Sequence, residues 1–139
     1  MKKKTSIILV IIWMIIIFIM SSFNADTSSS QSNIIVNFIS NIFNINNINL
    51  LSFIIRKLAH FTEYFILGIL LYNCFIISFN MNLYIPIIIC IMYAISDEIH
   101  QLFVSGRVFQ VRDIIIDTCG GIIGIILFHI YKQKFDKKK

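Results

Sequence analysis

The sequence predicts an all-α, polytopic membrane protein: a four-transmembrane-helix bundle with both termini in the cytoplasm and an interfacial helix between the first two spans. Two observations of composition support this class, because the chain is 58% hydrophobic and only 14% charged, and its mean hydropathy is +0.84. The third observation is that uncharged runs recur at lengths near the roughly 20 residues that a helix needs to cross the hydrocarbon core. With this spacing, we expect residues 1–139 to form one membrane domain.

Most of the twelve Lys and Arg residues lie at the two ends of the chain. Lysine-rich flanks of short loops mark the cytoplasmic side of a membrane, so both ends are predicted inside, and an even number of spans agrees. The basic balance therefore predicts no nucleic-acid partner. The terminal cations are Lys2, Lys3, Lys4, Lys132, Lys134, Lys137, Lys138 and Lys139.

The first apolar run, Thr5–Phe23, follows the N-terminal lysines and predicts an uncleaved first span. A signal peptide cleaved near Ala25, which would remove residues 1–25, is the alternative, although signal cores are usually only about 7 to 15 residues long. The Ser-rich segment Asp26–Gln31 then predicts a loop. Residues 33–49 place an apolar stripe at helical spacing between Asn and Ser residues, which predicts a helix lying along the membrane interface. An ordered loop is the alternative there, because Asn favours helices weakly. The stripe consists of Ile35, Phe38, Ile39, Ile42 and Ile45.

The rest of the chain divides into three further spans. Pro86 falls near the start of one of them, where a helix tolerates it. Cys74, Cys90 and Cys119 have no paired spacing, which indicates packing in the core. The predicted order is a span Leu58–Phe79, a turn Asn80–Asn82, a span Leu83–Val104, a loop Ser105–Arg112, a span Asp113–Tyr131 and a solvated tail Lys132–Lys139.

Ionisable side chains inside these spans are the candidate site. Each costs about 2.5 to 3.5 kcal/mol on insertion scales, so they persist where they are paired or functional. Under the predicted topology all of them except His129, which sits alone near the inner end of the last span, fall in the outer leaflet. We therefore expect one polar pocket open to the outside. Its candidate binding residues are Arg56, Lys57, His60, Glu63, Tyr64, Asp97, Glu98, Gln101, Arg107, Arg112, Asp113 and Asp117.

Helical spacing assigns these residues to faces. His60, Glu63 and Tyr64 share one face with Arg56 by i, i+3 and i+4 spacing, and Asp97 shares another with Gln101, whereas Glu98 points to a different partner. In the last span, Asp113 and Asp117 precede a small-xxx-small pattern that allows close approach of another helix. The pattern consists of Gly120 and Gly124, next to Gly121.

Several chemistries suit this set. Arg107 and Arg112 could bind an anionic oxygen such as a phosphate. Glu63, Asp97 and His60 are the candidate acid–base groups of an enzyme. His60, Glu63, Asp97 and Asp117, with Glu98 nearby, are the candidate ligands of a divalent metal, the one cofactor that these side chains would suit. Taken singly, each charged residue is more often a structural tether between helices. A function as a small ion carrier or a proton-coupled carrier ranks last among the hypotheses. The sequence contains no GxSxG, HExxH or paired CxxC motif that would fix a reaction.

Three linked motifs between residues 56 and 124 resemble the VanZ-like family of small bacterial membrane proteins. The resemblance implies a multi-pass protein of the bacterial plasma membrane, connected with resistance to glycopeptide antibiotics of the teicoplanin type. We therefore expect the pocket to bind an anionic envelope lipid or a lipid-linked wall precursor. The alternative is that the protein is a membrane enzyme that carries out acid–base or metal-assisted transfer or hydrolysis on an envelope lipid. Two positions depart from the family's pattern: Ser105 stands where the family has Pro, and Asp117 where Asn is also familiar. The motifs are Lys57-x-x-His60-Phe61-x-Glu63-Tyr64, Ser96-Asp97-Glu98-x-x-Gln101-x-Phe103 through Arg107, and Asp113-x-x-x-Asp117-x-x-Gly120, with Ser21 and Ser22 after the first span.

Overall fold

The computed structural model describes residues 3–43 and 46–136, with the backbone alone at Ala25, Asp26, Gln31 and Asp136. All regular structure within these ranges is helical, as predicted. Residues Lys2, Asn44, Ile45 and 137–139, for which the sequence also made predictions, lie outside the described part. The helices are α1 (Lys3–Ser21), α2 (Ala25–Phe43), α3 (Ile48–Tyr72), the π-helical turn η1 (Asn73–Ser78), α4 (Tyr84–Gln101) and α5 (Val111–Asp136).

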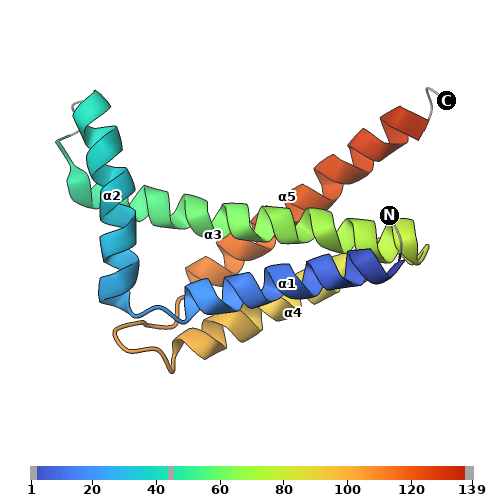
Figure 1. Ribbon diagram of the computed structural model, residues 1–139, viewed down its shortest axis with the longest axis horizontal. Coiled ribbons are helices and arrows are strands. Elements are labelled where there is room, and N and C mark those ends of the chain that lie inside the picture. The colour runs from blue at the N-terminus through green and yellow to red at the C-terminus, as the bar shows by residue number, and fades with distance from the viewer. Residues whose placement is uncertain (1–2, 44–45, 137–139) are drawn as a thin grey trace.

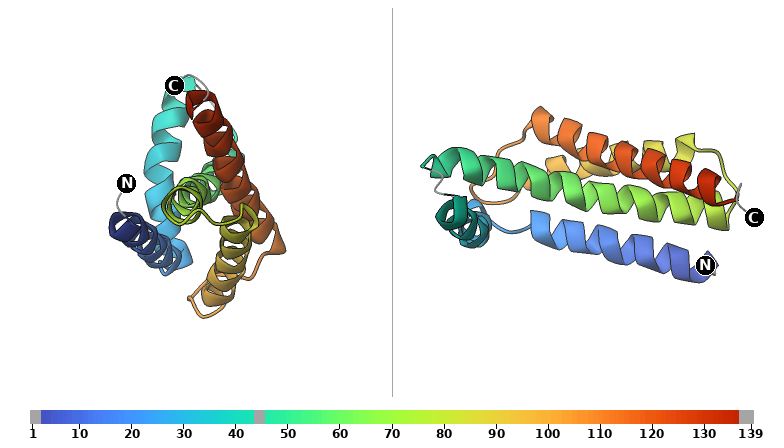
Figure 2. Two further views of the ribbon diagram at one scale, coloured as in Figure 1. Left: turned by 90° about the vertical axis from the view of Figure 1, so that its right-hand side faces the viewer. Right: turned by 90° about the horizontal axis from the view of Figure 1, so that it is seen from above.

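Helices α1, α3, α4 and α5 run in alternating directions along the bundle, with α5 oblique to α3, and α2 crosses the N-terminal part of α3 (Figures 1 and 2). The start of α1, the turn after η1 and the end of α5 lie at one end of the bundle. The α1–α2 linker, α2 and the α4–α5 loop lie at the other end, which we call the cleft end. The start of α1 and the end of α5 thus share an end, which is the arrangement that an even number of crossings would need.

Three segments are long and apolar enough to cross a membrane: Lys3–Ser21, Ile48–Ser78 and Val111–Phe135, with mean hydropathies of 2.4, 1.6 and 2.0. They indicate a helical membrane protein. The fourth predicted span corresponds to α4, which has 18 residues and carries Asp97, Glu98, His100 and Gln101 in its last two turns. These polar residues lower its hydropathy, so a crossing by α4 stays a prediction.

The predicted loop at Asp26–Gln31 is wrong, because α2 begins at Ala25 and includes it. The Asn24 side chain caps this helix by accepting a hydrogen bond from the Thr27 backbone N–H at 2.8 Å. The serines that suggested a loop lie on the helix, and Ser32 is buried together with Val36. The alternative of an ordered loop beginning at residue 33 is also wrong for residues 33–43, because α2 continues to Phe43.

Other boundaries shift for similar reasons. α3 begins at Ile48, well before the predicted Leu58, because the Asn47 side chain caps it by accepting a hydrogen bond from Leu50 N–H. α4 ends at Gln101, so Val104 lies in the following loop. α5 begins at Val111, which places Arg112 in a helix and not in the predicted loop, and it continues past Tyr131 through part of the predicted tail. The predicted turn after η1 is present, with Asn80 at a φ of 55°.

Glycines bring α3 and α5 into backbone contact. A Cβ added at Gly120 would meet the carbonyl oxygen of Phe61, and one added at Gly124 would meet that of Phe65, both closer than real Cβ atoms come. Gly68 lies in the same way against the carbonyl of Gly121. The prediction that the small-xxx-small face of the last helix packs on a neighbouring helix is therefore confirmed.

His129 is not alone at the end of the bundle away from the cleft, so that prediction is wrong. Its Nδ1 lies 2.8 Å from the Tyr72 hydroxyl oxygen, and its Nε2 lies 2.8 Å from the side-chain nitrogen of Gln133. The ring also packs edge-on against the ring of Tyr72. His129 thus ties α5 to the end of α3, a tertiary contact that the spacing within one helix could not show.

Candidate functional site

Two adjoining cavities at the cleft end form the candidate site, and we call them together the polar cleft. The first has a volume of about 170 Å³ and lies between α1, α2, α3 and the α4–α5 loop. The second, of about 270 Å³, lies between α2, α3, the α4–α5 loop and the start of α5. Ser28, Arg56, His60 and Arg107 line both. Further polar residues lining one of them are Ser21, Ser32 and Glu63 in the first and Lys57, Gln101, Gln110 and Asp113 in the second.

Arg107 belongs to the α4–α5 loop, and hydrogen bonds to two neighbouring segments hold its side chain in place. Arg107 follows Gly106, whose φ of 75° is a conformation that suits glycine. The guanidinium donates through Nε to the carbonyl oxygen of Phe23, at 3.2 Å, and through Nη1 to Oε1 of Gln101, at 3.4 Å. Gln101 in turn donates to Oδ2 of Asp97 at 3.3 Å. Asp97 and Gln101, predicted to share a face of one helix, therefore act together on the position of Arg107.

Glu98 anchors the other end of the same loop. Its side chain is fully buried, and its Oε1 accepts a hydrogen bond from the backbone N–H of Gln110 at 2.5 Å. The separate partner that its position after Asp97 predicted is thus a backbone group of the loop. Neither Glu98 nor Asp97 lines the polar cleft.

One ion pair and one histidine–carboxylate contact join α3 to α5. Lys57 Nζ lies 2.5 Å from Oδ1 of Asp113. His60 Nδ1 lies 3.5 Å from Oδ1 of Asp117, without hydrogen-bond geometry, and the Asp117 side chain is fully buried. The ring of Phe53 lies beside the Lys57–Asp113 pair. Lys57 Nζ is 5.3 Å from the ring centroid, and the guanidinium carbon of Arg112 is 5.8 Å from it.

Beneath the cleft, several buried polar atoms lack a hydrogen-bond partner among the described residues. Both carboxylate oxygens of Asp117 and the hydroxyl of Tyr64 lack such a partner, and neither side chain has any surface exposed to solvent. Such groups cost free energy unless a water molecule, an ion or a ligand satisfies them. The remaining atoms of this kind are Ser21 Oγ, His60 Nδ1, Asp97 Oδ1, Glu98 Oε2 and His100 Nδ1.

The structure brings most of the candidate residues to the cleft end but gives them different positions. Seven of them line the polar cleft, and Tyr64, Asp97, Glu98 and Asp117 are buried behind it. Arg112 lies over Phe53 outside the lining of both cavities. With Asp113 counted, seven candidate residues line the cleft: Arg56, Lys57, His60, Glu63, Gln101, Arg107 and Asp113.

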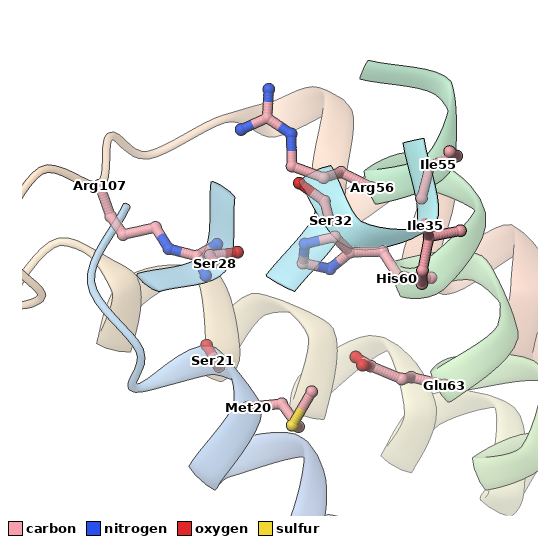
Figure 3. A pocket seen from close by; sticks show the side chains of 11 residues that line it. Met20, Ser21, Ser28, Ser32, Ile35, Ile55, Arg56, His60, Glu63 and Arg107 are labelled. Carbon is pink, nitrogen blue, oxygen red and sulfur yellow. The ribbon is translucent and has the colours of Figure 1, made fainter. Parts of the chain in front are cut away.

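Sequence reasoning missed Ser28 and Ser32 as lining residues. Both come from α2, one turn apart, and the expectation of a loop at Asp26–Gln31 hid their common face. Asn24 as a helix cap, followed by a serine at i+4 and another at i+8, was the available signal. Figure 3 shows their side chains beside those of Arg107 and His60.

In the part of the chain that the structure describes, no three His, Cys, Asp or Glu side chains converge as metal ligands would. Of the four candidate ligands, His60 and Glu63 line the cleft, whereas Asp97 and Asp117 are buried, with Asp117 lying 3.5 Å from His60.

Comparisons with known proteins give one match. The family model VanZ/LLP1 matches residues 6–132, a range that contains all the helices lining the cleft. No curated protein and no solved structure matches the chain.

Proposed function

Because the chain belongs to the VanZ-like family, we propose that it is a multi-pass protein of the bacterial plasma membrane whose polar cleft binds a phosphate-bearing headgroup. The headgroup would be that of an anionic envelope lipid or a lipid-linked wall precursor. By holding such a molecule, the protein would alter the action of glycopeptides of the teicoplanin type, which is the role that the family resemblance implies.

One observation supports this proposal above the others: two guanidinium groups face one cavity with no carboxylate ion-pair partner among the described side chains. Within that part of the chain Arg107 donates to neutral oxygens, those of Phe23 and Gln101. Arg56, which lies across the cavity from it (Figure 3), forms no ion pair within residues 3–43 and 46–136. Guanidinium groups recognise phosphate oxygens in pairs of parallel hydrogen bonds. His60 and the hydroxyl of Ser28 add further donors on the same walls, whereas the hydroxyl of Ser32 donates to the carbonyl oxygen of Ser29.

The setting of the cleft suits a ligand that arrives from the membrane. One wall belongs to α2, whose other side exposes Ile34, Phe38 and Ile42 to the extent of 74%, 67% and 56%. A helix with an exposed apolar side and a polar remainder is suited to lie in the headgroup region. In that position the cleft would open at the depth of lipid phosphates, with the cations of the cleft end around it.

Replacing either arginine by glutamine should weaken binding of anionic lipid by roughly tenfold or more, because a charge-assisted hydrogen bond is lost. Full-length protein in phosphatidylcholine nanodiscs containing phosphatidic acid and phosphatidylglycerol provides the measurement, by native mass spectrometry of the lipids retained. Arg56→Gln and Arg107→Gln are the test variants. Arg112→Gln is the matched control, since Arg112 lies over Phe53 outside the cleft.

Equal retention of anionic lipid by all three variants would contradict the proposal.

The enzymatic alternative is favoured by one feature, the position of His60 between Asp117 and the cleft, because an imidazole beside a carboxylate is a common general base. If the wild-type protein converts the bound lipid, and His60→Gln retains the lipid without converting it, the alternative replaces simple binding.

Sidedness follows from the same proposal. A cysteine placed at Ser105, in the α4–α5 loop, should react with a membrane-impermeant maleimide in intact cells, because the cleft end is proposed to face outward. A cysteine at Asn82, in the turn at the opposite end, should react only after lysis. The background carries alanine at Cys74, Cys90 and Cys119. Labelling of position 82 but not 105 in intact cells would reverse the topology.

A further inference from the structure

Glu63 places an acidic group among the cations of the polar cleft. Its side chain lines the first cavity together with Arg56, His60 and Arg107, and Figure 3 shows it pointing into that cavity from α3. The backbone carbonyl of Glu63 accepts a hydrogen bond from the Trp13 indole at 2.9 Å, which fixes this turn of α3 against α1. Its carboxylate has no hydrogen-bond or ion-pair partner in the described residues.

A carboxylate in this place restricts which anion can bind. An ionised carboxylate only accepts hydrogen bonds, so it repels a neighbouring phosphate oxygen that carries no hydrogen. It forms a short, strong O–H···O bond with a phosphate oxygen that does carry one. Phosphate monoesters have a second pKa of about 6 and therefore hold such a hydrogen readily near neutral pH. Phosphodiesters and sulfate esters have no hydrogen to offer.

The charges around the cavity suit a phosphate of charge −1. Arg56 and Arg107 bring two positive charges and Glu63 one negative charge, so a diester and a monoester that keeps one hydrogen both balance the set, and the hydrogen alone distinguishes them. His60 adds a donor, and its own acidic neighbour, Asp117, is buried behind it. From α2, the described side chains at this cavity are uncharged, and they include Ser28 and Ser32.

From this arrangement we infer that the cleft selects a phosphate monoester over a phosphodiester, with Glu63 as the specificity-determining residue that accepts the P–O–H hydrogen. The inference rests on the proposed function and narrows its ligand to lipids that end in a monophosphate. The same chemistry is present in inorganic phosphate, so the experiment separates a lipid from a free anion.

Phosphatidic acid and phosphatidylmethanol provide the sharpest comparison, because the second differs from the first by one methyl ester that removes the hydrogen. Both are offered to the full-length protein in phosphatidylcholine nanodiscs, and the ratio of bound lipids is measured by native mass spectrometry. We expect wild type to prefer phosphatidic acid by roughly tenfold or more. In Glu63→Gln the ratio should fall to near one, because the amide can donate to a diester oxygen and phosphatidylmethanol binding rises.

Two variants and one competitor complete the experiment. Glu63→Asp keeps the carboxylate and should retain part of the preference, while Thr62→Val, whose exposed hydroxyl bonds only to the carbonyl of Leu58, should behave as wild type. Inorganic phosphate that displaces phosphatidic acid, where sulfate does not, would show that the free anion suffices. Failure of both anions to displace it, with the preference intact, would show that the lipid is needed.

A wild-type ratio near one, or an unchanged ratio in Glu63→Gln, overturns the selectivity while leaving lipid binding in place. Retention of neither anionic lipid above the phosphatidylcholine background overturns the proposed function as well. If Glu63→Gln does not fold, the wild-type ratio and the Glu63→Asp ratio still decide the inference.

Discussion

Replacement of Gly68 by leucine is expected to abolish folding of the bundle. A Cβ at this position would lie against the carbonyl oxygen of Gly121, in the backbone of α5. Backbone cannot rotate away as a side chain can, so α3 and α5 would have to separate. Their separation would also open the contacts of Gly120 with Phe61 and of Gly124 with Phe65. A membrane bundle depends on such close packing, because lipid tails solvate apolar side chains as well as a neighbouring helix does.

The measurement is thermal unfolding in detergent, in which the fraction of protein that remains monodisperse is read by size-exclusion chromatography. Gly68→Leu should give no monodisperse peak, and Gly68→Ala should lower the free energy of unfolding by about 1 to 3 kcal/mol, the usual cost of overpacking. Thr62→Leu adds the same side chain to an exposed position of the same helix and should leave the unfolding midpoint unchanged. A stable Gly68→Leu protein would mean that α3 and α5 are not held at backbone distance.

The sequence was sufficient to predict the helical class and the close approach of the last helix. Both depend on properties that are local to a segment, namely long apolar runs and the spacing of Gly120 and Gly124. The expectation that buried ionisable groups share partners has a physical reason, because such groups are costly in an apolar environment. In the structure Asp97 has Gln101 as a partner, and Gln101 has Arg107.

The errors arise where a tertiary contact decides the structure. The composition of Asp26–Gln31 favours a loop, but the Asn24 cap and the burial of Ser32 make it helical. Within α4 the spacing of Asp97 and Gln101 was readable from the sequence, but the partner of Glu98 was not. That partner is the backbone of Gln110, in a loop whose course the sequence does not specify. Both carboxylates support the loop that carries Arg107 in the structure.

The second large effect is expected at the ion pair between Lys57 and Asp113. Their side chains are only 16% and 6% exposed, and the two atoms lie 2.5 Å apart. Removing one partner leaves the other charge buried and unpaired, which typically costs about 3 to 5 kcal/mol. Asp113 also lies in the first turn of α5, where a negative charge stabilises the helix dipole. Lys57→Met and Asp113→Leu should each lower the unfolding midpoint strongly.

The double variant separates pairing from packing. With both charges replaced by apolar side chains of similar length, neither is left unpaired, so Lys57→Met with Asp113→Leu should recover most of the stability that each single change removes. Lys134→Met, at an exposed position in the last turn of α5, controls for the loss of a cation and should have little effect. If the two single effects simply add in the double variant, the pair is not coupled. The stability of the cleft end would then come from the packing of α3 on α5, with the charges contributing to ligand binding alone.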